Sequence, residues 1–211
     1  MSQAPGLLQA KFTHPRYWFT WLGYLCLRLL ALLPQSMHVP ISRGLGRAMY
    51  QLGPRRRHIA ETNLQRCFPE MPTQQRQRLL RNNFAHLGAM LIDLSVSWFG
   101  SPQRLRSQTE IRGLEALLDS LNAKRGCILL VAHQTAIEVG GQALALALSD
   151  NEHELLVMYK RNRNELMETL VQRGRRRFTN KLVPHSDMLG LIRNLKQGAP
   201  CWYAPDQDFG S

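Results

Sequence analysis

The pattern of apolar positions divides the chain into a helical first half and an alternating second half. Between residues 73 and 99, apolar side chains recur at the three- and four-residue spacing of a helix, and Thr73 is placed to cap its start. The Gly-Ser-Pro sequence at 100–102 is expected to end this helix. A shorter amphipathic helix is predicted over 111–122.

After residue 124, short continuous apolar runs alternate with amphipathic segments. Asp187 is placed to cap the last of these segments, and Gly198 to end it. Strands alternating with helices indicate a mostly parallel sheet flanked by helices. The sequence therefore predicts an α/β fold, with strands over 126–132, 154–160 and 200–204 and helices over 137–148, 164–174 and 187–198.

An apolar and aromatic run near the start, from Tyr17 to Pro34, is close to the minimum length for a membrane span. Arg28 interrupts it, which makes the span borderline, so the segment either crosses the bilayer or lies in its interface. A buried core helix is the alternative. We expect an N-terminal membrane anchor over 1–40, a helical segment over 41–125 and an α/β core over 126–211.

The charge adds a class of partner to this picture. The 211 residues carry a formal net charge of +12, with an apolar content of 44% that excludes a disordered chain. A chain this basic is expected to meet nucleic acid, an anionic membrane surface or an acidic protein. The cysteines form no CxxC pair and the histidines no ligand cluster, so no metal site is predicted.

The candidate chemistry follows the first predicted strand. His133 comes directly after it and Glu138 five residues later, an HX4E spacing. In one straight helix these two side chains would point about 140° apart, so they converge only if His133 lies in the turn before the helix. A carboxylate on one imidazole nitrogen would make the other a general base. The spacing is weak by itself, and a capping histidine beside a surface glutamate is the alternative. A serine hydrolase is not supported, because the sequence has no GxSxG.

A basic block follows, with ten Lys or Arg but three Asp or Glu between residues 160 and 196. Guanidinium groups suit phosphate, and a solvated helix face is the alternative. Aromatic side chains, which would favour nucleic acid, are few in this block. Further on, Asp206 and Asp208 follow the last predicted strand, where they can bind a cation, orient a base or form a plain turn, and the turn is favoured.

Four separated segments resemble one family: KFTHPRYWFTWLGY, RRRHIAETNLQRCFPEM, VAHQTAIEVGG and WYAPDQDFG. In this order they look like the late (lauroyl/myristoyl) acyltransferases of lipid A biosynthesis, in the lysophospholipid acyltransferase-like superfamily with its HX4D/E motif. The resemblance implies transfer of a fatty acyl chain from acyl carrier protein to a hydroxyl of a Kdo-lipid A precursor.

The resemblance also implies site residues and partners. His133 would be the general base and Glu138 would orient it, with Arg175 on lipid phosphate or the developing oxyanion. Substrate-binding positions are expected at Lys160, Arg161, Asn164, Arg175, Arg177, Asp206 and Asp208. No cofactor is implied beyond the phosphopantetheine of the carrier protein. The implied partners are acyl carrier protein, an anionic glycolipid and the bacterial inner membrane, with the catalytic part on its cytoplasmic face and no nucleic acid.

Family members continue beyond a PDQD-like motif, so the sheet is expected to be incomplete at the C-terminus and the activity of the chain reduced. Two alternatives stay open beside lipid A acylation. One is an acyltransferase of the same fold acting on glycerophosphate or a lysophospholipid. The other is a non-catalytic basic module that binds membranes, and nucleic-acid binding is a weaker third.

Overall fold

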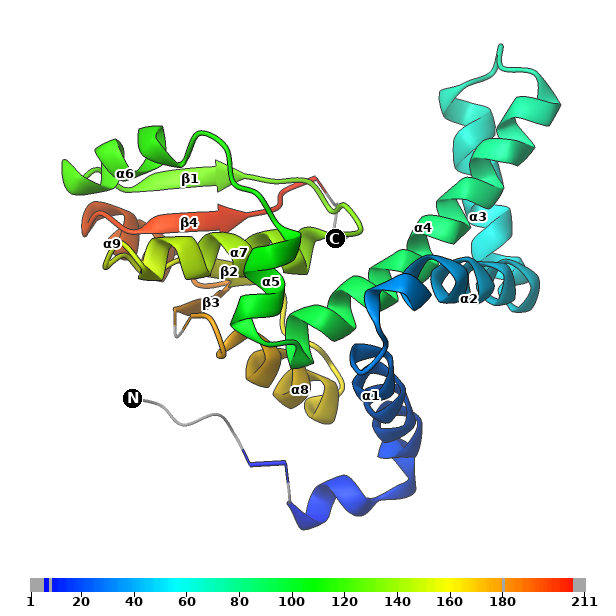
Figure 1. The fold of residues 1–211 in the computed structure, drawn as a ribbon, viewed down its shortest axis with the longest axis horizontal. Helices are drawn as coiled ribbons and strands as arrows, with labels where there is room; N and C mark the ends of the chain where they lie inside the picture. Colours follow the sequence, from blue (N-terminus) through cyan, green and yellow to red (C-terminus); the bar gives the residue numbers. More distant parts are fainter. Residues whose placement is uncertain (1–5, 8, 180, 207–211) are drawn as a thin grey trace.

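The computed structural model describes residues 6–7, 9–179 and 181–206 (Figure 1). Helices form the first half and an α/β unit the second. The first half contains α1 (Trp18–Ala31), α2 (His38–Leu52), α3 (Pro54–Cys67), α4 (Thr73–Phe99) and α5 (Pro102–Gln108). The α/β unit contains α6 (Leu114–Asn122), β1 (Cys127–Leu130), α7 (Ile137–Ser149), β2 (Leu156–Tyr159), α8 (Glu165–Arg175), β3 (Leu182–Pro184), α9 (Met188–Lys196) and β4 (Pro200–Tyr203).

The described strands form one parallel sheet in the order β1-β4-β2-β3, which confirms the predicted parallel α/β arrangement. β4, the last of them in the sequence, lies between β1 and β2. Leu130 at the end of β1 is in register with Tyr203 at the end of β4. The carboxyl ends of these two strands therefore lie side by side.

Helices cover both faces of the sheet. Successive strand residues point to opposite faces, so the sheet packs against helices on both sides. Val157 and Trp202 pack toward a cluster that includes Leu144 and Leu148 of α7 and residues of α6. Their chain neighbours Leu156 and Cys201 pack with Leu191 of α9 in a second cluster. The sheet is thus the middle layer of three.

The predicted helix ends lie within two residues of the observed ones, except at the start of α6. α4 ends at Phe99 as expected, but its N-cap is Pro72, and no side chain caps it, so the prediction for Thr73 is wrong. The helix predicted over 111–122 is α6, which begins at Leu114, later than expected. At α9 the Asp187 side chain accepts a hydrogen bond from Gly190 N–H at 2.8 Å, and Gly198 follows with a φ of +85°, both as predicted.

Figure 1 shows α2, α3 and the first part of α4 projecting away from the α/β unit; we call this projection the helical arm. α2 crosses α4 at very short range. A Cβ atom at Gly88 would lie 2.0 Å from the Ser42 carbonyl oxygen, and one at Gly46 2.5 Å from the Phe84 carbonyl oxygen. Both positions require glycine, since any side chain would collide with the backbone of the opposite helix.

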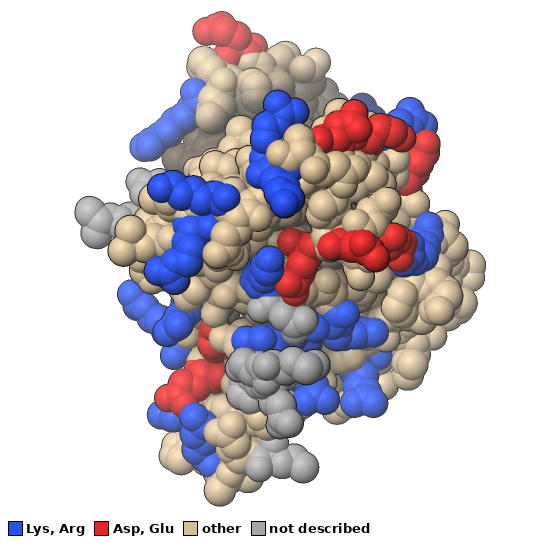
Figure 2. Space-filling view, turned by 90° about the vertical axis from the view of Figure 1, so that its left-hand side faces the viewer, with Lys and Arg blue, Asp and Glu red and all other residues tan. Residues whose placement is uncertain are grey.

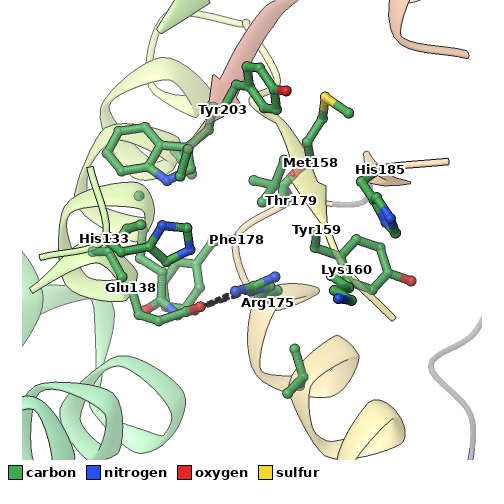
Figure 3. A pocket seen from close by; sticks show the side chains of 18 of the residues that line it. His133, Glu138, Met158, Tyr159, Lys160, Arg175, Phe178, Thr179, His185 and Tyr203 are labelled. Atoms are coloured by element: carbon green, nitrogen blue, oxygen red, sulfur yellow. Dashed lines mark hydrogen bonds and ion pairs between the residues drawn. The ribbon is translucent and has the colours of Figure 1, made fainter. Parts of the chain in front are cut away.

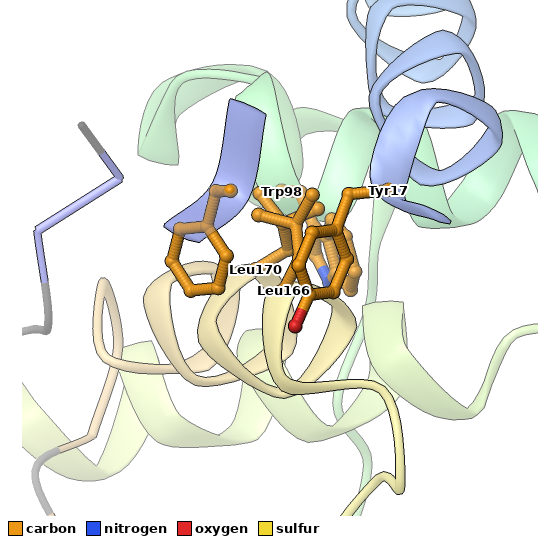
Figure 4. Close-up of a cluster of buried hydrophobic side chains, with 5 residues drawn as sticks. Tyr17, Trp98, Leu166 and Leu170 are labelled. Atoms are coloured by element: carbon orange, nitrogen blue, oxygen red, sulfur yellow. The ribbon is translucent and has the colours of Figure 1, made fainter. Parts of the chain in front are cut away.

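The segment before α1 packs onto the α/β unit. Phe12 and Tyr17 are buried in an edge-to-face pair with ring centroids 5.3 Å apart, together with Leu166 and Leu170 of α8 and Trp98 at the end of α4 (Figure 4). This cluster fixes the start of the chain against α8, and the Lys11 ammonium adds an ion pair with Glu165 at 2.7 Å.

The outward side of α1 is apolar. Phe19 is 87% exposed, and Trp18, Leu22, Leu25, Leu29 and Leu32 are also exposed. The predicted run from residue 17 to 34 does not form one long helix, because α1 has 14 residues. Among the described helices no single one is long and apolar enough to cross a bilayer. Taken together, the segments Pro15–Ala31 and Gln35–Leu52 have the required length and apolar composition, with a 120° bend between them.

Candidate functional site

A cavity of about 340 Å³ lies beside the carboxyl ends of β1, β4 and β2, where parallel sheets hold their ligands (Figure 3). Polar side chains from three elements reach it: His133 after β1, Glu138 from α7 and Arg175 from α8. Its walls are largely apolar and include Ile137, Ala145, Val157, Met158, Val171, Phe178 and Trp202. An apolar ligand with one polar end would suit this lining.

His133 is held by Asp206. The Asp206 carboxylate accepts the His133 backbone N–H at 2.8 Å through one oxygen, and its other oxygen lies 2.6 Å from His133 Nδ1. The sheet register explains this contact, because each residue lies three positions beyond the paired residues Leu130 and Tyr203. Orienting a base was one of the roles left open for Asp206.

The contact with Asp206 determines which imidazole nitrogen of His133 can accept a proton. A carboxylate can only accept at Nδ1, so that nitrogen carries the proton and Nε2 keeps a lone pair. The hydrogen bond from the His133 backbone N–H, followed by that from the ring, lowers the pKa of Asp206 below its ordinary value. The carboxylate therefore stays charged, and His133 can act as a base through Nε2.

Glu138 binds Arg175. Arg175 Nε lies 3.0 Å and 3.3 Å from the two carboxylate oxygens, and its terminal Nη2 also contacts Glu138. The side chains are largely sheltered, 19% exposed for Glu138 and 23% for Arg175. This differs from the expectation that Glu138 orients His133: both line the cavity, but His133 has Asp206 as its carboxylate. The reason is the register of β1 with β4, which spacing along the chain does not reveal.

A hydrogen-bonded group on the opposite wall was missed by sequence reasoning. The Tyr159 hydroxyl donates to Glu168 at 3.0 Å and accepts from Gln172 at 3.0 Å. Burial, then the hydrogen bond to Glu168, raises the pKa of Tyr159. Burial would raise the pKa of Glu168 as well, but hydrogen bonds from the Asn162 backbone, Gln172 and Tyr159 outweigh it and lower that pKa. The i, i+4 spacing of Glu168 and Gln172 on α8 was the available signal.

The remaining predicted site residues differ in where they lie relative to the cavity. Lys160 lines the cavity, whereas Arg161 lies exposed on the loop after β2, outside the lining. Asn164 caps α8 by accepting Met167 N–H at 3.0 Å and donates to Thr20 at 3.0 Å. Arg177 points away from the cavity and binds the carbonyl oxygens of Trp98 and Gly100. Asp208 lies outside the described residues.

Asn164 and Arg177 therefore form hydrogen bonds within the protein, whereas the sequence predicted that they would contact the substrate. Arg177 satisfies carbonyl groups at the end of α4 that the helix itself leaves without donors. Burial lowers its pKa. Arg177 also does not line the cavity, so its guanidinium is not placed to meet a ligand there.

On the face drawn in Figure 2, the Lys and Arg side chains lie in separate groups, and acidic side chains lie between them near the centre of the view. Ion pairs also reduce the free charge of the basic block, as between Lys181 and Glu154 at 3.9 Å. Among the described residues no group of His, Cys, Asp and Glu is arranged to hold a metal ion.

Comparison with known proteins gives a consistent picture. Residues 8–211 match the family described as bacterial lipid A biosynthesis acyltransferase. The chain is 34% identical over 197 residues to the lipid A biosynthesis lauroyltransferase of Escherichia coli K12, and 32% identical over 200 residues to its lipid A biosynthesis palmitoleoyltransferase. It is 33% identical over 204 residues to a lipid A biosynthesis acyltransferase of Haemophilus influenzae.

These matches cover 93%, 95% and 96% of this chain, and 63%, 64% and 63% of the respective relatives. The chain thus spans a little under two thirds of the length of these relatives. The resemblance carried by the four sequence segments is confirmed over nearly the whole chain. Because the family match extends over residues 8–211, the chain belongs to the bacterial lipid A biosynthesis acyltransferases.

Proposed function

We propose that this protein is an acyltransferase that moves a fatty acyl chain from acyl carrier protein to a hydroxyl of a Kdo-lipid A precursor. The observation that carries the proposal is the pairing of His133 with Asp206 at an apolar cavity on the carboxyl edge of the sheet. The printed activities of the relatives, lauroyl and palmitoleoyl transfer in lipid A biosynthesis, support the substrate class.

The reaction uses His133 Nε2 as the general base. Nε2 takes the proton of the acceptor hydroxyl while that oxygen attacks the thioester carbonyl carbon. The tetrahedral intermediate then collapses, the C–S bond breaks and the carrier thiol leaves with the proton from His133. Asp206 holds the imidazole in the reactive tautomer and stabilises the imidazolium that forms between the two steps.

Arg175 is the residue placed to meet negative charge. Glu138 fixes its guanidinium from one side, through Nε and Nη2, at the cavity wall. The N–H groups that Glu138 does not use can donate to a lipid phosphate or to the oxyanion of the intermediate. Glu138 is a positioning residue in this proposal, acting through Arg175.

The exposed apolar side of α1 supports a membrane location. Trp18, Phe19 and the leucines that follow would enter the interface of the inner membrane, on its cytoplasmic face. The acceptor glycolipid would lie in that membrane, and the acidic carrier protein would dock on the basic enzyme to deliver the acyl chain to it. The carrier protein and the glycolipid would then both be reached from the cytoplasmic side of the membrane.

The test is the mass of lipid A from a bacterial strain lacking this gene, before and after the gene is restored. Gain of one acyl chain is the expected result, and the mass difference gives the chain length. His133→Ala should abolish the gain, since loss of a general base lowers the rate by about 10²- to 10⁴-fold. Acylation of lysophospholipid instead of lipid A, in membranes offered both acceptors, would overturn the proposed acceptor.

A further inference from the structure

Glu168 joins three parts of the chain on the side of the cavity opposite His133. It lies in the first turn of α8, is partly buried and does not itself line the cavity. One carboxylate oxygen accepts the Asn162 backbone N–H at 2.8 Å and the Asn162 side-chain amide at 3.4 Å. The other oxygen accepts the Tyr159 hydroxyl at 3.0 Å and Gln172 Nε2 at 2.6 Å. The carboxylate therefore receives four hydrogen bonds, from the end of β2, from the loop after it and from the next turn of α8.

The groups that Glu168 binds belong to the cavity wall. Tyr159 and Asn162 line the cavity, and so does Lys160, which lies between them in the sequence. The guanidinium carbon of Arg175 lies 6.0 Å from the centre of the Tyr159 ring, and Figure 3 shows Tyr159 and Lys160 beside Arg175. Glu168 thus lies behind the part of the wall that adjoins the residue placed to meet negative charge.

The loop after β2, residues 160–163, is exposed, so packing does little to fix it. An exposed loop of this kind is held by its hydrogen bonds and opens locally when they are lost. The bond from the Asn162 backbone N–H to Glu168 ties the middle of this loop to α8. The shape of this side of the cavity therefore depends on a carboxylate that stands outside the cavity.

Glu168 must be charged to accept all of these bonds. A carboxylate offers acceptors alone, whereas an amide or a protonated carboxyl group presents a donor where Asn162 or Gln172 also donates. Burial favours the neutral form, but the hydrogen bonds from Asn162, Gln172 and Tyr159 outweigh burial and lower the pKa of Glu168. The N-terminal end of α8 favours negative charge as well. Loss of the charge would leave at least one donor facing another.

We infer that Glu168 is a positioning residue for acyl transfer, whose ionised carboxylate fixes Tyr159 and the loop 160–163 against α8. This side of the cavity is then formed before a substrate arrives, which lowers the free-energy cost of binding. Glu168 acts through the residues that it holds. The inference rests on the proposed function in one respect, namely that the cavity is the site of acyl transfer.

The first experiment measures the loop and needs neither turnover nor a variant. Amide hydrogen exchange is followed at Asn162 in the wild-type protein. Although Asn162 lies in an exposed loop, its N–H should exchange at least about tenfold more slowly than a free amide, because it is bonded to Glu168. Exchange at the rate of a free amide would overturn the inference.

Glu168→Gln removes the charge and keeps the size of the side chain. The slow exchange at Asn162 should be lost in this variant, whereas exchange in β4 should stay as in the wild type. Glu165→Gln is the matched control: Glu165 lies in the same turn of α8, but its carboxylate pairs with Lys11 at 2.7 Å and does not line the cavity. An equal loss of protection in the control would assign the effect to the charge of the turn and overturn the inference.

A double variant, Glu168→Gln with Gln172→Glu, moves the carboxylate by one helical turn. The amide oxygen at position 168 can accept from Asn162, and its nitrogen can donate to the Tyr159 hydroxyl, which donates to the carboxylate at position 172. The network is restored with the bonds around Tyr159 reversed, so protection of the Asn162 amide should return. A folded double variant whose loop stays unprotected would overturn the inference. This variant and the wild-type measurement carry the test if Glu168→Gln alone does not fold.

The closing experiment measures transfer from a carrier-protein thioester to the lipid A precursor, with kcat and KM determined separately. Glu168→Gln should raise KM about tenfold and change kcat less than about threefold, because the residue shapes the binding wall and does not meet the reacting atoms. Glu165→Gln should match the wild type, and the double variant should return toward it. An unchanged KM in Glu168→Gln, or a fall in kcat alone, would overturn the inference. Absence of transfer by the wild-type protein would instead contradict the proposed function, and the exchange at Asn162 is measured independently of it.

Discussion

The α/β unit and helix α1 place their apolar side chains in opposite ways. In the α/β unit Leu148, Leu156 and Leu166 are fully buried between helices and sheet. On α1, Phe19 and Leu32 remain 87% and 76% exposed, and nothing in the described part of the chain covers them. The α/β unit therefore supplies its own apolar environment, whereas α1 is suited to one that lies outside the protein. Chemistry and membrane contact should then respond to different substitutions.

The largest effect on stability is expected where the start of the chain meets the α/β unit. Phe12→Ala removes a ring that is 2% exposed between Tyr17 and α8, and should lower the free energy of unfolding by about 3 kcal/mol. Lys11→Met is the control, because the Lys11–Glu165 pair is half-exposed and such surface pairs contribute little to stability. Urea unfolding measures both. Similar losses in the two variants would mean that the start of α1 is held by charge and not by packing.

A large effect on chemistry is expected at Asp206. Asp206→Asn keeps the side-chain shape but presents an uncharged group to His133 Nδ1, so the rate of acyl transfer should fall on the order of a hundredfold. Vesicle binding should not change. Glu138→Gln is the comparison: it should act through Arg175 and raise KM more than it lowers kcat if Arg175 binds phosphate. A hundredfold fall in kcat for Glu138→Gln with a normal Asp206→Asn would assign the orienting role to Glu138.

The pH dependence follows from the direction of the Asp206 shift. Hydrogen bonds from His133 lower the pKa of Asp206, so its contribution to stability is present above the pKa of the unfolded state and is lost as pH falls through the lower folded value. At pH 5 and above the carboxylate stays charged. The Asp206 carboxyl carbon, followed by NMR, should therefore show no protonation between pH 8 and pH 5. Protonation of this carboxyl group above pH 5 would contradict the assignment.

In the helical arm, the effect of Gly88→Ala on stability should be intermediate. The added methyl group would meet the Ser42 carbonyl oxygen at 2.0 Å, and overpacking of this kind costs about 1–3 kcal/mol. Gly44→Ala, on the open side of α2, meets nothing within 4 Å and should stabilise the helix by about 0.5–1 kcal/mol. Thermal unfolding compares the two. A destabilising Gly44→Ala would show that α2 has a second packed side.

The smallest effect is expected for membrane contact. Replacing Leu22 and Leu25 with serine should weaken binding to anionic vesicles about tenfold, because two half-exposed leucines lose their transfer free energy. The stability of the protein in solution should stay the same. Leu189→Ser on α9 is the control, since this residue is 74% exposed but lies outside α1. An equal loss of vesicle binding in the control would remove the distinction between α1 and the α/β unit.

Local patterns predicted the elements well where one side of a segment is buried. The helix from residue 73 to 99, the helix after β1 and the Asp187 cap all follow from spacing and capping chemistry. α2 and α3 fall largely within the helical segment expected over 41–125, but their separate bounds were not predicted, since α3 is polar in composition and α2 relies on glycines at a helix crossing. β3 is three residues long, too short for a periodic signal.

The sequence predicted which residues form the site better than it predicted the contacts between them. His133, Glu138, Arg175, Lys160 and Asp206 were all named from the sequence, and each of them lines the cavity or binds a residue that does. Which carboxylate meets which base could not be predicted. That depends on the strand order, and a pairing between residues 73 positions apart is invisible to local spacing.

The insertion of β4 between β1 and β2 has a consequence for synthesis of the protein. The chain emerges from the ribosome with its N-terminus first, so β1 and β2 are complete well before the strand that joins them. Until residues 200–206 arrive, β1 has no neighbour in the sheet and His133 has no carboxylate. The joining of β1 to β2 and the contact between His133 and Asp206 therefore depend on the same segment of the chain, residues 200–206.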